Sequence, residues 1–366
     1  MRKQFINNIR WFVVFMLVPY HAACVYRTTY LGFFISFQGK HAEFFEYFVF
    51  ALALWIMPML FALAGASAVY AIEKRSIGEF VKERIKRLLI PLIVSTILLS
   101  PIQMYISNLY HGVYVKGYFW RDVFKFFTSD SFGGYTGGFS YTGFWFIRHL
   151  FFMSILLIPF LWLYVNKGSK FKEVLGKFSI PMIMLFAFLP AEGYAINYSD
   201  YSFYEFAAWF LLGAVVLTND EIINKLSKNC WLLMAIMIVG TYFYCWAIKN
   251  TKWYTFVIWT PCSRLLRWEC ILAVVGLFKR CFDKENGFTR YMTDSSYGYY
   301  IFHQTILIVV GYFTIVKLRG PFQGNDLKLY AVTVGATWLL TFAAYEIVHR
   351  IPVVRGWIGY KPKKKN

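Results

Sequence analysis

Charged residues are scarce in this sequence. Asp, Glu, Lys and Arg make up only 16% of the 366 residues, whereas 58% are hydrophobic and 22% are aromatic. A soluble domain usually carries about a quarter charged residues. The composition therefore excludes an ordinary soluble protein. It predicts an all-α, polytopic integral membrane protein that lies in a lipid bilayer.

Cysteine motifs are also missing. The six cysteines, at positions 24, 230, 245, 262, 270 and 281, form no CxxC and no paired spacing. This pattern indicates neither a disulfide framework nor a zinc site. We therefore expect no bound metal and no permanently bound cofactor.

Acidic residues are few compared with basic ones. The chain has 19 Asp and Glu against 38 Lys and Arg, a net charge of +19. Such an excess would also suit a nucleic-acid-binding protein. Here the basic residues lie in short clusters between apolar runs, as in loops that stay on the cytoplasmic side of a membrane. We expect a multi-pass protein of the cytoplasmic membrane, with both termini in the cytoplasm and no nucleic-acid partner.

Long apolar runs dominate the rest of the sequence. We expect about ten transmembrane helices, at residues 8–26, 47–72, 91–110, 144–165, 180–189, 203–217, 230–248, 254–278, 297–316 and 329–348. An even number of crossings agrees with two cytoplasmic termini. No internal repeat and no soluble domain is evident. Residues 1–366 are therefore predicted to form a single domain, with a helical bundle over 1–350 and a basic cytoplasmic tail over 351–366.

Small residues recur every four positions in the second predicted span. Alanine occupies positions 62 and 66, and again positions 64 and 68. This spacing lets two membrane helices approach closely. We interpret it as a packing feature rather than a catalytic one.

The first predicted span carries a cation at its start and a histidine in its apolar interior. Arg10 and His21 are separated by about three helical turns, so both lie on one face roughly 16 Å apart. Pro19 frees a backbone carbonyl just before His21. An ionisable residue at this depth indicates a functional site. A histidine that is simply hydrogen-bonded to a neighbouring helix would explain the pattern as well.

A basic segment precedes the third predicted span and ends in Arg84-Ile-Lys-Arg87. It would serve as a cytoplasmic anchor. Arg84 and Arg87 are also three positions apart on one helical face, where their planar donors would bind the oxygens of a phosphate. The two interpretations are compatible.

Other ionisable residues lie in the later predicted spans: Arg148, His149, Arg264, Arg267, Glu269 and His303. Arg267 and Glu269 point to different sides of a helix, so their partners should come from other helices or from a ligand. The segment between the third and fourth spans is rich in glycine and aromatic residues, especially over 132–141. It would suit a sugar acceptor or form a disordered loop.

Four motifs of the sequence occur together in a known family. The interval from Arg10 to His21, the Arg84-to-Arg87 element, Phe144-Trp-Phe-Ile147 and Ser296-Tyr-Gly-Tyr-Tyr-Ile-Phe-His303 resemble the acyltransferase family 3 membrane proteins. The opening Val18-Pro-Tyr-His21 and the closing Tyr345-Glu-Ile-Val-His-Arg-Ile-Pro352 resemble the branch of glucans biosynthesis protein C. The likeness covers essentially the whole chain.

The resemblance implies an enzyme that moves an acyl group from cytoplasmic acyl-CoA to a hydroxyl of an extracytoplasmic glycan. In the glucan branch the acyl group is succinyl, and acetyl is the other candidate. His21 would be the catalytic histidine, Arg10 its motif partner, and Arg84 and Arg87 would lie near the CoA phosphates. Ala64-Gly65 stands where the family often has Ser-Gly.

The residue types suit this chemistry. A sugar hydroxyl is a poor nucleophile, and a histidine is well matched to take its proton as it attacks a thioester. A covalent acyl-histidine is an alternative. We expect Arg148, Arg264 or Arg267 to bind the far carboxylate of a succinyl donor. His149 and His303 would orient other groups or serve a structural role, and both are candidates for substrate binding.

Two functions of other classes remain open from the residues. A transporter or flippase of a glycan or lipid precursor would explain the helices and the intramembrane arginines, but no matched pair of interrupted helices is evident in two halves of the chain. A sensor or assembly protein would not need His21.

Overall fold

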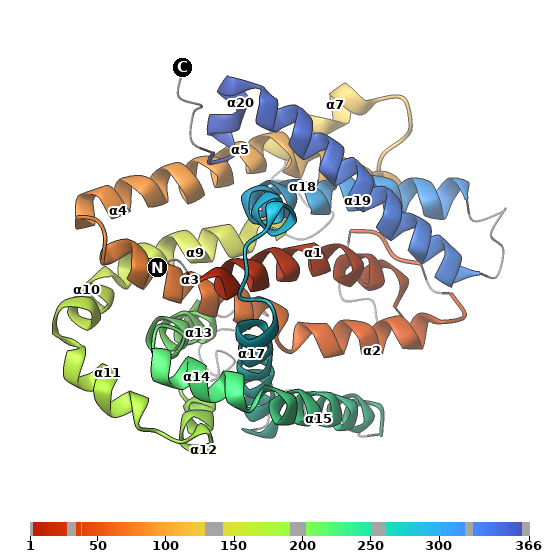
Figure 1. Cartoon of the computed structure of the whole chain (residues 1–366). Helices are drawn as coiled ribbons and strands as arrows, with labels where there is room; N and C mark the ends of the chain where they lie inside the picture. Colours follow the sequence, from red (N-terminus) through yellow and green to blue (C-terminus); the bar gives the residue numbers. More distant parts are fainter. Residues whose placement is uncertain are drawn as a thin grey trace. The chain divides into compact units, whose positions relative to one another are not determined.

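The computed structural model describes residues 3–27, 34–37, 39–128, 142–190, 203–250, 261–318 and 325–360. All regular secondary structure in these ranges is helical (Figure 1). The all-α prediction is therefore confirmed. The aromatic segment 132–141, the start of the predicted span 254–278 and the end of the basic tail, Lys363-Lys-Lys365, lie outside the described residues.

The chain divides into two compact units, which are described separately. Unit 1 comprises Met1–Val13, Phe50–Arg84 and His149–Thr293, and unit 2 comprises Val14–Val49, Ile85–Arg148 and Asp294–Asn366. The helices α1 (Gln4–Tyr26), α2 (Ala42–Ala53), α9 (Trp145–Leu156) and α18 (Gly287–Lys317) contribute residues to both units.

The other helices belong to one unit each. Unit 1 contains α3 (Ile56–Ile72), α4 (Ile77–Arg84), α10 (Ile158–Lys167), α11 (Ser169–Gly176), α12 (Ile180–Met184), η3 (Leu185–Phe188), α13 (Phe203–Val216), α14 (Asp220–Lys228), α15 (Cys230–Asn250) and α17 (Pro261–Cys281). Unit 2 contains η1 (Ile85–Leu89), α5 (Ile90–Leu98), α6 (Ser100–Tyr110), α7 (Phe119–Val123), α8 (Lys125–Thr128), η2 (Thr142–Phe144), α19 (Asp326–Arg350) and α20 (Pro352–Trp357).

Several of these helices are long and apolar enough to cross a membrane. Within the described residues there are six such spans, or eight if two bent helix pairs each count as one span. The bends are 55° between α9 and α10, within the predicted span 144–165, and 93° between α13 and α14. The chain is thus a multi-pass membrane protein. Ten crossings and cytoplasmic termini stay predictions.

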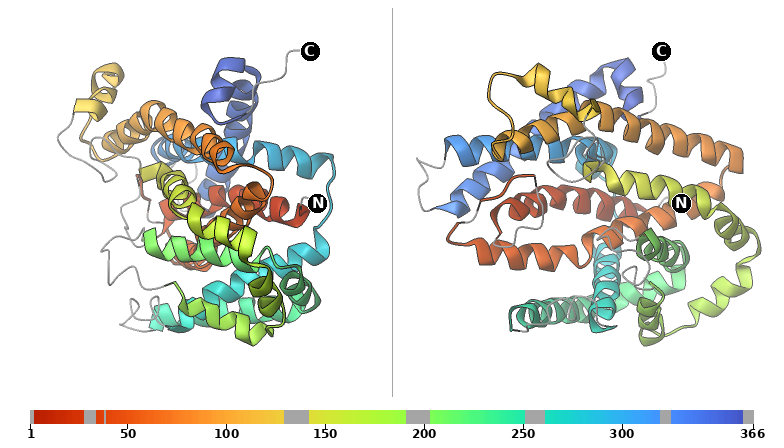
Figure 2. Two further views of the ribbon diagram at one scale, coloured as in Figure 1. Left: turned by 90° about the vertical axis from the view of Figure 1, so that its left-hand side faces the viewer. Right: turned by 180° about the vertical axis from the view of Figure 1, so that it is seen from behind.

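Unit 1 is built around a close contact between α3 and α13 (Figures 1 and 2). A Cβ atom added at Gly65 would lie 1.8 Å from the carbonyl oxygen of Phe210, and one added at Gly213 would lie 1.9 Å from the carbonyl oxygen of Ala62. Only glycine fits at this separation. The prediction that helices approach closely at residues 62–68 is therefore confirmed.

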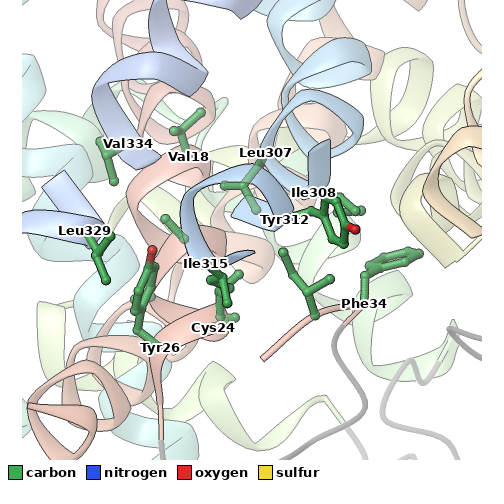
Figure 3. Packing of buried hydrophobic residues seen from close by; sticks show 14 of the residues in the cluster. Val18, Cys24, Tyr26, Phe34, Leu307, Ile308, Tyr312, Ile315, Leu329 and Val334 are labelled. Carbon is green, nitrogen blue, oxygen red and sulfur yellow. The ribbon is translucent and has the colours of Figure 1, made fainter. Parts of the chain in front are cut away.

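Unit 2 has a core that joins the second half of α1 to α18 and α19. Val18 and Tyr26 of α1 pack in one cluster with Leu307 of α18 and Val334 of α19, and each of these side chains is buried (Figure 3). The Tyr26 hydroxyl is hydrogen-bonded to Thr333 at 2.9 Å. Apolar burial therefore fixes the part of α1 that carries His21 against the part of α18 that carries His303.

Pro19 lies inside α1 without ending it. Proline cannot donate to the carbonyl four residues earlier, which here is that of Phe15. The indole N–H of Trp338 on α19 donates to this carbonyl at 3.4 Å, and the Trp338 ring stacks on Phe15 with centroids 4.3 Å apart. The Tyr330 hydroxyl donates to the carbonyl of Pro19 at 3.1 Å. The acceptor freed by the proline therefore receives its hydrogen bond from α19.

Candidate active site

The centre of unit 2 holds a pair of histidines. Nδ1 of His21 on α1 lies 3.2 Å from Nε2 of His303 on α18, and the two rings are roughly parallel, with centroids 5.2 Å apart and an interplanar angle of 29°. His303 is buried, whereas His21 is partly exposed. The fold thus brings together two histidines that the sequence separates by most of the chain.

The partners of His303 assign the protons on both rings. Nδ1 of His303 lies 2.7 Å from the carbonyl oxygen of Tyr300 and 3.1 Å from that of Tyr299. Carbonyl oxygens only accept hydrogen bonds, so this nitrogen carries the proton, and Nε2 of the neutral ring is an acceptor. His21 must then donate from Nδ1. Neutral His21 therefore keeps its lone pair on Nε2, the nitrogen that a general base needs.

Aromatic side chains surround this pair within unit 2. The Tyr20 ring lies next to His21 with centroids 5.0 Å apart, and the Tyr300 ring lies 5.8 Å from that of His303. Tyr300 also contacts Phe146 at 5.5 Å. The Phe144-to-Ile147 motif and the Ser296-to-His303 motif, read separately in the sequence, therefore meet at one place.

Arg10 lies on the first turns of α1, in unit 1. Its Nη2 donates to the hydroxyl oxygen of Ser67 on α3 at 2.6 Å, and that hydroxyl donates to the carbonyl of Leu63, also at 2.6 Å. Nη1 lies 3.5 Å from the side-chain oxygen of Asn7. Arg10 thus fixes the start of α1 to α3, a partner that the sequence did not indicate.

The two arginines of the basic segment fall in different units. Arg84 ends α4 in unit 1, with its guanidinium 4.5 Å from the centre of the Phe80 ring. Arg87 lies in unit 2 within η1, a π-helical turn, and its side chain is exposed. Its carbonyl accepts a hydrogen bond of 2.6 Å from the Tyr297 hydroxyl of α18. Such π-turns often mark functional sites.

Arg267 has an acidic partner. It forms an ion pair of 2.9 Å with Glu205 of α13, which confirms that its partner comes from another helix. Both oxygens of the buried Glu269 lack a hydrogen-bond partner among the described residues, so the two do not pair locally. Arg267 thus has a carboxylate partner within the protein, and its role toward a succinyl donor stays a prediction.

The structure places each of the remaining predicted site residues in one of the two units. His149 is buried in unit 1, where its ring contacts Phe203 at 5.7 Å. Arg264 is partly exposed on α17 of unit 1, and Arg148 is partly exposed on the unit 2 part of α9. No group of three His, Cys, Asp or Glu side chains that would hold a metal occurs in the described part of the chain.

Comparison with known proteins decides the class of the protein. A family model described as an acyltransferase domain matches residues 3–345. The chain belongs to the acyltransferase 3 family. This acyltransferase 3 protein is therefore an O-acyltransferase, and family membership favours an enzyme over a transporter or a sensor. No curated protein and no solved structure matches it, and no finding supports the narrower branch of glucans biosynthesis protein C.

Proposed function

We propose that the protein transfers an acyl group from cytoplasmic acyl-CoA to a hydroxyl of an extracytoplasmic glycan, with His21 as the general base. The observation that carries this proposal is the His21–His303 pair, which leaves the lone pair of His21 on Nε2. The chain would cross the cytoplasmic membrane ten times. A succinyl donor and a glucan acceptor remain predictions from the sequence.

The reaction needs one proton acceptor. Nε2 of His21 takes the proton of the acceptor hydroxyl as its oxygen attacks the thioester carbonyl. The tetrahedral intermediate collapses, the C–S bond breaks, and the imidazolium returns the proton to the CoA sulfur. His303 accepts from Nδ1 of His21 throughout, so it holds the ring in one tautomer and stabilises the charge that forms on it. This is the arrangement of a base that a third group orients.

The other predicted residues have separate roles in this proposal. Arg84 and Arg87 bind the phosphates of CoA through planar, charge-assisted hydrogen bonds. Arg10 positions α1 through Ser67, so it acts on His21 through the helix that they share. Arg148 and Arg264 are the residues that would bind the far carboxylate of a succinyl donor.

The test measures CoA release from acyl-CoA by purified full-length protein in nanodiscs. His21→Ala should reduce the rate by roughly 10²- to 10⁴-fold, the usual contribution of a general base, while the melting temperature stays unchanged. The matched control is His111→Ala. His111 is exposed at the end of α6 and interacts with the carbonyl of Ser107 at 2.8 Å.

Two outcomes would change the account. Unchanged CoA release by His21→Ala would defeat the assignment of the base. A trapped acyl group on His21, found by mass spectrometry of acid-quenched protein, would replace general-base catalysis with a covalent acyl-histidine.

A further inference from the structure

The chain beyond α19 is folded back on unit 2. Within the predicted basic tail, residues 351–366, Pro352–Trp357 forms α20, which packs against α5. Gly359 has φ of +80°, and a Cβ atom there would lie 3.3 Å from the carbonyl oxygen of Arg87 and 3.2 Å from Pro91. The segment after α20 therefore lies directly against the turn that carries Arg87.

Tyr360 fixes this position. Its hydroxyl donates to the carbonyl of Asp294 at 2.8 Å and accepts from the N–H of Gly298 at 3.0 Å. Burial raises the pKa of Tyr360 well above its ordinary value, so the hydroxyl keeps the proton that it donates. Tyr297, the next residue in this stretch of α18, donates to the carbonyl of Arg87. One short stretch of α18 thus holds both the Arg87 turn and the segment after α20.

Arg355 of α20 is the charged residue that this arrangement leaves unexplained. Its side chain is only partly exposed, and its Nε and Nη1 atoms are buried without a hydrogen-bond partner among the described residues. Glu346 of α19 is paired with Arg350 at 3.1 Å. Buried guanidinium donors without an acceptor are costly and therefore uncommon. The structure thus calls for an oxyanion beside Arg355.

We propose that Arg355 binds a phosphate group together with Arg87, as part of the site for the acyl donor. The inference rests on the proposed use of acyl-CoA. Its nucleotide end carries several phosphate oxygens, and a guanidinium binds these in pairs. A phospholipid headgroup offers the same chemistry, so the experiment separates the two sources.

The spacing of Tyr297 and His303 along α18 agrees with a donor phosphate at Arg87. Tyr297, which holds Arg87, and His303 lie on the same helix, about 9 Å apart along its axis at 1.5 Å per residue. Arg87 and the histidine pair both belong to unit 2. A donor whose phosphates lie at the Arg87 turn therefore has the histidine pair further along the helix, in the direction in which its thioester arm would extend.

The experiment measures the dissociation constants of CoA and of pantetheine, which lacks the nucleotide and phosphates, for full-length protein in phosphatidylcholine nanodiscs. Arg355→Gln should weaken CoA binding roughly ten- to a hundredfold, as expected for a lost hydrogen bond to a charged group. Its binding of pantetheine should not change. Arg355→Lys keeps the charge and loses the planar fork, so its loss should be smaller.

The matched control is Arg350→Gln. Arg350 is an exposed arginine just before α20, with 76% of its side chain accessible and Glu346 as its partner. It should bind CoA as the unaltered protein does. Melting temperatures check that each variant is folded, and Arg355→Lys keeps the test valid if Arg355→Gln does not fold.

Three results are informative. Weaker CoA binding in Arg355→Gln supports the donor site. If Arg355→Gln binds CoA as before but retains less phospholipid in native mass spectrometry than the unaltered protein, the site holds a lipid headgroup and the acyl-donor assignment is overturned. Unchanged binding of both overturns the inference. None of these results depends on turnover, so failure here is distinct from failure of His21→Ala to stop CoA release.

Discussion

Two histidines of unit 2, His21 and His41, differ in the kind of side chain that each one contacts. His21 meets the ring of His303, whereas His41 meets the carboxylate of Asp326 through Nδ1 at 2.5 Å. Asp326 also accepts from the backbone N–H of His41 at 2.7 Å. The Asp326 carboxylate therefore binds both the backbone and the imidazole ring of His41. Nε2 of His303 instead accepts from the ring of His21, and its Nδ1 donates to carbonyls of its own helix.

This difference indicates separate roles. The His41–Asp326 pair joins the segment before α2 to the first turn of α19, and Asp326 is buried although His41 is partly exposed. A Cβ atom at Gly39 would lie 2.4 Å from Asp326, so this segment is packed closely as well. We interpret the pair as a structural connection. Changes at the His21–His303 pair should alter the rate, and changes at the His41–Asp326 pair should alter stability.

The largest effect in this comparison is expected for His303→Leu. It removes the ring nitrogen that accepts from Nδ1 of His21 and should lower kcat roughly ten- to a hundredfold, the equivalent of a hydrogen bond worth about 1.5–3 kcal/mol. KM for acyl-CoA should stay within twofold. Steady-state kinetics of CoA release check this.

His303→Gln is the control for this prediction. The carbonyl oxygen of Gln can still accept from Nδ1 of His21, so this variant should recover part of the lost kcat. If His303→Leu and His303→Gln are equally slow in kcat and melt at lower temperature, His303 is structural and the comparison fails.

A smaller effect, on stability rather than rate, is expected for Asp326→Asn. The amide keeps one acceptor oxygen but loses the charge, so the free energy of unfolding should fall by about 1–3 kcal/mol. Differential scanning fluorimetry in nanodiscs measures the change in Tm. The kcat of the folded fraction should stay within twofold, and a loss as large as that of His303→Leu would make His41 a second base.

The smallest effect is expected for Ser67→Ala in unit 1. Arg10 keeps its contact with Asn7 but loses the acceptor at 2.6 Å on α3. If Arg10 acts on His21 only through α1, only part of this charge-assisted hydrogen bond should be felt at His21, and kcat should fall about two- to fivefold, the equivalent of about 0.5–1 kcal/mol. A loss comparable to that of His21→Ala would give Arg10 a direct part in the reaction.

The sequence predicted the features that depend on local pattern. Apolar runs gave the helices, the alanine spacing gave the close contact at Gly65, and Pro19 gave the freed carbonyl of Phe15. Each follows from residues within a few turns of one another. That Arg267 pairs with a residue of another helix was predictable for the same reason. Glu269, the acidic residue nearest to it in the sequence, points to a different side of the same helix.

The sequence could not predict partners that the fold brings from far away. His303 was one of several candidate histidines, and only the fold places it against His21. No local pattern marks Glu205 as the partner of Arg267 or Asp326 as the partner of His41. The π-helical turn at Arg87 and the packing of the segment after α20 also follow no local sequence pattern. Both are held by hydrogen bonds to residues of α18.

The central claim, that His21 and His303 act as one base, is tested most directly by a double-mutant cycle on kcat for CoA release. Residues that act as a unit show strongly non-additive effects. We predict that His21→Ala combined with His303→Leu is as slow as His21→Ala alone, because an orienting partner has nothing to orient once the base is gone. If the two losses multiply instead, the histidines contribute independently and the claim is contradicted.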